Sequence, residues 1–106
     1  MVDMNEECRK IAEDTIEILK GLEGDEAAQR EYFDDILDID YIVNGFNRSY
    51  RGVIIAVTLG GPGVYVDTYA RQVKVCWGTA RHAEELPKDV TDMIDDWFND
   101  LWVCGF

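Results

Sequence analysis

Residue types that build catalytic and metal sites are scarce in this 106-residue chain. There is one histidine, His82, and the three cysteines stand far apart, at Cys8, Cys76 and Cys104. A zinc site needs Cys and His ligands at short, regular spacings, and a disulfide framework needs an even number of cysteines. The sequence therefore predicts no metal, no cofactor and three reduced thiols, and it offers no Cys–His signature of a nucleophile.

Long apolar runs are also missing. No segment approaches the roughly 20 apolar residues that a membrane-spanning helix needs. Residues 1–7 lack the basic start and the apolar stretch of a signal peptide. We therefore expect a cytoplasmic protein that does not associate with membranes.

Basic residues are few compared with acidic ones. Ten Lys and Arg stand against 22 Asp and Glu, which gives a net charge of −12. The excess lies at the two ends, with a balance of −10 in residues 1–40 and −6 in residues 84–106, whereas residues 41–83 carry +4. A field of one sign attracts oppositely charged partners and repels nucleic acid and anionic membranes. The sequence therefore favours a basic protein partner and argues against direct binding of nucleic acid.

Apolar residues recur at steps of three and four in three segments, which is the spacing of one helix face. The first segment lies near the N-terminus, the second is capped by Asp25, and the last begins at Pro87. The expected inward residues are Cys8, Ile11, Ala12, Thr15, Ile16, Leu19 and Leu22, then Ala28, Tyr32, Phe33, Ile36 and Leu37, and finally Val90, Met93, Ile94, Trp97, Phe98 and Leu101. Trp97 is expected to face a sheet, and Trp102 to be partly exposed.

Between the helices the apolar period changes to two, which indicates strands. The connections between them are too short for crossovers, so the strands should form an antiparallel meander. Its more apolar face is expected to collect Tyr41, Val43, Val53, Ile55, Val57, Val64, Val66, Val73, Val75 and Trp77. The sequence thus predicts one α+β domain over residues 1–106, with two N-terminal helices, a three- to four-stranded meander and a C-terminal helix. The helices should all pack on one face of the sheet.

Three short features have plain structural interpretations. The segment Gly60–Gly63 is glycine-rich, but a strand follows it and no lysine is near, so it predicts a hairpin loop and not a phosphate site. Arg48 and Arg51 lie in a basic, aromatic loop, which we interpret as a connection whose arginines pair with the acidic helices; the alternative is a contact with an acidic spot on a partner. His82 is expected in a surface loop.

Acidic side chains follow the outer faces of the second and last helices. In the last helix Asp92, Asp96 and Asp100 repeat every four residues, about 6 Å along the axis. Like charges at this spacing destabilise a helix by a few tenths of a kcal/mol per pair. They lie on exposed faces without the apolar pocket that a general acid needs, so we expect a binding surface and not an enzyme. The expected partner-binding residues are Asp89, Asp92, Asp95, Asp96, Asp100, Glu31, Asp34, Asp35 and Asp38.

The segment from Leu59 to Thr68, with residues 73–78 and the helix end at 97–102, resembles small acidic proteins of phages and prophages in Firmicutes. Small size, acidity and an α+β meander are also similar in style to anti-CRISPR and other anti-defence proteins. This resemblance implies no catalytic residues. It implies a non-enzymatic, phage-encoded inhibitor in the host cytoplasm. The inhibitor would bind a basic nucleic-acid-handling host protein, first of all an RNA-guided CRISPR nuclease, through acidic helix faces that compete with DNA.

Two other functions fit the same sequence. An immunity protein or antitoxin for a basic toxin would use the same acidic faces. A small-ligand-binding domain or an enzyme would instead use the second face of the sheet, with Tyr65, Lys74 and Cys76, together with the glycine-rich loop.

Overall fold

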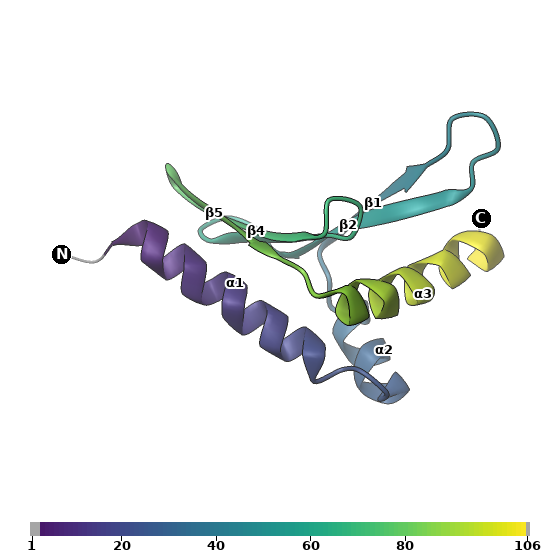
Figure 1. Cartoon of the computed structure of the whole chain (residues 1–106), viewed down its shortest axis with the longest axis horizontal. Helices are drawn as coiled ribbons and strands as arrows, with labels where there is room; N and C mark the ends of the chain where they lie inside the picture. Colours follow the sequence, from purple (N-terminus) through teal and green to yellow (C-terminus); the bar gives the residue numbers. More distant parts are fainter. Residues whose placement is uncertain (1–2, 106) are drawn as a thin grey trace.

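The computed structural model describes residues 3–105, which form three helices and five strands (Figure 1). In chain order these are α1 (Met4–Lys20), α2 (Glu26–Asp34), β1 (Asp38–Val43), β2 (Tyr50–Thr58), β3 (Gly63–Asp67), β4 (Gln72–Trp77), β5 (Ala80–Glu85) and α3 (Lys88–Gly105). The predicted α+β class and the order of helices around a meander are confirmed.

The sheet has five strands, one more than the upper number of the three to four that the sequence predicted. Its five strands are antiparallel neighbours in the order β1-β2-β3-β4-β5. The extra strand is β5, which contains His82, a residue that the sequence assigned to a loop. It has few apolar residues, and its position is set by backbone pairing with β4 through a tight turn at Gly78, where φ is +62°.

All three helices lie on one face of the sheet, as predicted (Figure 1). Helix α1 packs across β4 and β5, and α3 packs on β2. One continuous core joins the inner faces of the helices to the inward side chains of β2, β3 and β4. Its fully buried members include Cys8, Leu19, Val53, Ile55, Val66, Val73, Val75, Leu86, Val90, Ile94 and Phe98. The glycine-rich segment forms the β2–β3 hairpin loop, as expected.

Helix α2 is shorter than its apolar pattern suggested. The Asp25 carboxylate accepts a hydrogen bond from the Ala28 N–H at 3.0 Å, which confirms the predicted cap. The helix ends at Asp34 because the Leu37 N–H donates to the Ala56 carbonyl and so joins the sheet. Leu37 is therefore 58% exposed and not inward as predicted.

Helix α3 has two apolar faces where the sequence suggested one. Val90, Ile94 and Phe98 are buried against the sheet, as predicted. Met93, Trp97 and Leu101 form a second face, which lies toward α2 and not toward the sheet. Because α2 covers this face only in part, Met93 and Trp97 are half-buried and Leu101 is 44% exposed. At the end of the sheet, Trp77, the last residue of β4 and one of those expected on the apolar face, is 36% exposed.

In the part of the chain described here, none of the helices has the length and apolar character required to cross a membrane.

Candidate functional site

Four of the five acidic residues of α1 are paired within the helix, and the fifth, Asp14, makes no ion pair within residues 3–105. Arg9 pairs with Glu6 and Glu13, Lys10 pairs with Glu7, and Lys20 pairs with Glu17. Every basic residue of α1 therefore lies three or four positions from a carboxylate that it contacts, the spacing at which helix side chains meet. Because of this pairing, the outer face of α1 is a poor candidate for attracting a basic partner.

The predicted acidic residues of α2 and α3 divide into two groups. Asp92 accepts a hydrogen bond from Lys88 at 2.8 Å, which raises the pKa of Lys88, and Asp95 is held by a tyrosine. The other seven carboxylates have no ion pair among residues 3–105, and all seven are exposed. They are Glu31, Asp34, Asp35, Asp38, Asp89, Asp96 and Asp100.

Asp95 has a structural contact that the sequence did not indicate. The Tyr50 hydroxyl, at the start of β2, donates to Oδ1 of Asp95 at 2.7 Å, and both side chains are half-buried. Burial and then the nearby carboxylate raise the pKa of Tyr50. This contact ties α3 to the sheet, so Asp95 is removed from the group of acids that are open to a partner.

Asp38 is also misplaced by the prediction. It begins β1 and pairs with Ala56, on the sheet face opposite to the helices. It therefore does not extend the acidic face of α2.

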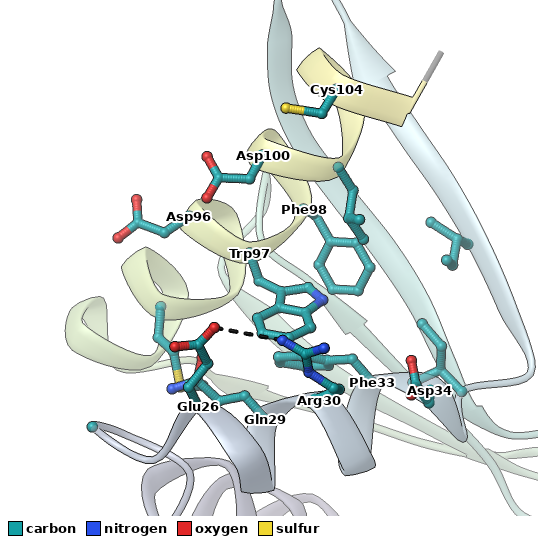
Figure 2. A pocket seen from close by; sticks show the side chains of 15 residues that line it. Glu26, Gln29, Arg30, Phe33, Asp34, Asp96, Trp97, Phe98, Asp100 and Cys104 are labelled. Atoms are coloured by element: carbon teal, nitrogen blue, oxygen red, sulfur yellow. Dashed lines mark ion pairs between the residues drawn. The ribbon is translucent and has the colours of Figure 1, made fainter.

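A groove between α2 and α3 brings three of the predicted acids together (Figure 2). The groove has a volume of about 1140 Å³. Asp96 and Asp100 line it from α3, and Asp34 lines it from the last turn of α2. Glu31, Asp35 and Asp89 do not line this groove, so the structure separates them from the first three.

Aromatic and aliphatic side chains form the inner wall of this groove. In Figure 2 the indole of Trp97 lies between the two helices, and its ring centroid is 5.4 Å from that of Phe33. Phe33 in turn contacts Phe98 at 5.2 Å. Ile36 and Ile39 continue the apolar wall from the end of α2 into β1. Among residues 3–105, Arg30 is the one cation that lines the groove, and it pairs with Glu26 at 3.6 Å.

The direction of the helices adds to the negative potential here. A helix C-terminus carries a partial negative charge, so a carboxylate there costs about 0.3–1 kcal/mol. Asp34 belongs to the last turn of α2, and neither α2 nor α3 has a basic residue in its last turn. Helix α1, by contrast, ends with Lys20. The unpaired carboxylate of Asp34 thus lies where the C-terminus of α2 adds further negative potential to the groove.

The basic loop between β1 and β2 does not pair with the helices as the sequence suggested. Among residues 3–105 neither Arg48 nor Arg51 makes an ion pair. The loop is held instead by its backbone, because the Trp102 indole N–H donates to the Arg48 carbonyl at 2.7 Å. Trp102 also packs against Tyr41, and Phe46 at the loop tip is fully exposed.

The alternative site on the second face of the sheet is partly assembled. Tyr65 and Lys74 are direct neighbours across β3 and β4, and Cys76 pairs with Gly63 at the end of the glycine-rich loop. However, the Lys74 ammonium already pairs with the Asp67 carboxylate at 3.3 Å. Within residues 3–105 no group of His, Cys, Asp and Glu side chains is arranged to hold a metal ion.

Comparisons of the chain with protein families, with curated proteins and with solved structures find no match.

Proposed function

We propose that this protein is a non-enzymatic, phage-encoded inhibitor that acts in the host cytoplasm. It binds a basic, nucleic-acid-handling host protein and covers the positive surface that this protein uses for DNA. An RNA-guided CRISPR nuclease is the first candidate. The proposal rests on the difference between α1, where four of the five carboxylates are paired, and the region of α2 and α3, where six of the predicted carboxylates have no ion pair within residues 3–105.

Electrostatic complementarity supports this type of partner. Asp96 and Asp100 are one helical turn apart, about 6 Å along the axis, and Asp34 adds a charge from the facing helix. Duplex DNA carries one charge per about 1.7 Å of axis, so one such stripe is sparser than DNA, and acids from two helices reduce the difference. A lysine- or arginine-rich cleft that has evolved for phosphates would therefore also attract this surface.

A direct test uses purified RNA-guided nucleases, each loaded with its guide, and a fluorescent target duplex. We expect the protein to lower both DNA binding and cleavage for a susceptible nuclease, and excess duplex to relieve the inhibition. A protein that binds a nuclease without displacing DNA would contradict the proposed competition. Inhibition of a basic toxin, with every nuclease unaffected, would favour the immunity-protein alternative.

A further inference from the structure

The groove between α2 and α3 is larger and more open than a typical small-molecule site. Pockets for small ligands usually enclose about 300–1,000 Å³, and this groove has about 1140 Å³. It follows α3 from Met93 to Cys104, a distance of about 16 Å at 1.5 Å per residue. These dimensions suit a segment of another protein better than a metabolite.

The apolar residues along α3 are spaced to meet a second helix. Met93, Trp97, Leu101 and Cys104 follow one another at three- and four-residue steps and line the same groove. Leu101 is 44% exposed and Ile39, on the opposite wall, is 38% exposed. The apolar stripe of α3 is therefore only partly covered by α2, and it leaves an apolar wall open to a partner.

The charges around this apolar wall determine whether a positively or a negatively charged segment can bind there. In the described part of the chain four carboxylates line the groove, those of Glu26, Asp34, Asp96 and Asp100. The one cation found there, Arg30, already pairs with Glu26. A nucleic acid, an acidic peptide or a second copy of this −12 chain would meet net repulsion here. A segment with lysines and arginines on both sides of an apolar stripe would meet complementary charges.

We propose that this groove binds an amphipathic, basic α-helix of the partner protein. The helix would place apolar side chains at i, i+3, i+4 and i+7 against Trp97, Leu101 and Ile39, as helices do in other hydrophobic grooves. Its flanking lysines and arginines would reach Asp96 and Asp100 on one side and Asp34 on the other. This inference takes one point from the proposed function, namely that the partner protein is positively charged.

The test uses synthetic peptides of about 18 residues, roughly five helical turns. One peptide places Leu on one helical face and Lys elsewhere; a second has the same composition in scrambled order; a third replaces each Lys by Glu. Titration calorimetry measures affinity, and the indole N–H resonance of Trp97 in NMR spectra reports where the peptide binds. We expect binding at low salt by the first peptide alone, with a shift of the Trp97 resonance.

Matched variants separate the groove from general attraction to an acidic protein. Leu101→Gln places an amide at an exposed apolar position and should weaken binding about tenfold. Leu59→Gln is the matched control, because Leu59 is 52% exposed but lies in the β2–β3 connection, outside the groove. This substitution should leave the affinity for the peptide unchanged. The double variant Asp96→Asn/Asp100→Asn should weaken binding about fivefold. A second double variant, Asp14→Asn/Glu85→Gln, removes the same charge outside the groove and should have little effect. Thermal melting confirms that each variant is folded.

Three outcomes would overturn the inference. Equal affinity for the scrambled peptide, or an unchanged affinity of Leu101→Gln, would mean that charge alone attracts the peptide. Failure of all three peptides to bind would mean that the groove takes no helix. Sedimentation that shows a dimer of the protein, dispersed by Leu101→Gln, would assign the groove to a second copy. None of these results depends on a nuclease, so the inference and the proposed function can fail separately.

Discussion

Two neighbouring aspartates of α3, Asp95 and Asp96, should have opposite roles, and this gives the sharpest test of the structure. The Tyr50 hydroxyl donates to Asp95 at 2.7 Å, whereas Asp96 is exposed and lines the groove. A hydrogen bond to a charged group contributes about 1.5–3 kcal/mol. Because both partners are half-buried, we expect the lower part of this range. Tyr50→Phe should therefore destabilise the protein by about 1.5–2 kcal/mol.

A double-mutant cycle measures this contact directly. Tyr50→Phe, Asp95→Asn and the double variant are unfolded in urea, and the coupling free energy should be about 1 kcal/mol. Asp96→Asn is the matched control, since it changes the adjacent residue in the same way. It should alter the free energy of unfolding by less than about 0.5 kcal/mol. A coupling near zero, or an equal loss in Asp96→Asn, would refute the assignment of Asp95 to the fold.

The raised pKa of Tyr50 adds a pH dependence with a definite sign. Because burial and Asp95 favour the neutral phenol in the folded state, the contribution is complete below the ordinary tyrosine pKa of about 10. It is lost as the pH rises above that value, since the unfolded chain then releases the proton first. The stability difference between the parent protein and Tyr50→Phe should therefore be smaller at pH 11 than at pH 8. A constant difference would contradict the shift.

Two further substitutions test the packing. Trp97→Ala should lower stability by about 2–4 kcal/mol, because the indole packs between α3 and Phe33 but is only half-buried; an unchanged melting temperature would show that the contact is unimportant. Gly52→Ala should cost about 1–3 kcal/mol, because a Cβ there would lie 2.9 Å from the Tyr69 Cβ, and a melting curve like that of the parent would disprove this close approach.

Much of the fold is predictable because its apolar periods are regular. The inward residues of α1 and the central strands follow single periods without interruption, and the structure buries nearly all of them. Strand β5 was not predicted because Arg81, His82 and Glu84 interrupt any alternation of apolar and polar residues. The signal that would have revealed it is the glycine-containing two-residue turn between Trp77 and Ala80, which is typical of a hairpin.

The candidate site was predictable in its charge but not in its shape. The acidic faces of α2 and α3 are visible in the sequence, whereas the groove depends on how two helices far apart in the chain pack together. The exposed edge of the α3 apolar stripe at Leu101 is a result of that packing. Similarly, no local pattern shows that Tyr50, 45 residues earlier in the chain, binds Asp95.

The central claim is that the carboxylates around the α2–α3 groove bind a basic partner. The most direct measurement uses a nuclease that the protein inhibits in the assay proposed above. Its affinity for the protein is measured at low and high salt and compared between two triple variants of equal charge. One variant combines Asp34→Asn, Asp96→Asn and Asp100→Asn. The control combines Asp14→Asn, Asp40→Asn and Glu85→Gln, which are exposed and outside the groove.

We expect the groove variant to lose affinity at low salt and to respond less to added salt than the parent protein, because fewer ion pairs remain to be screened. The control should keep nearly the affinity of the parent at both salt concentrations. Equal losses in the two triple variants would show that net charge, and not this surface, governs association. An affinity that does not change with salt in the parent protein would contradict the electrostatic account.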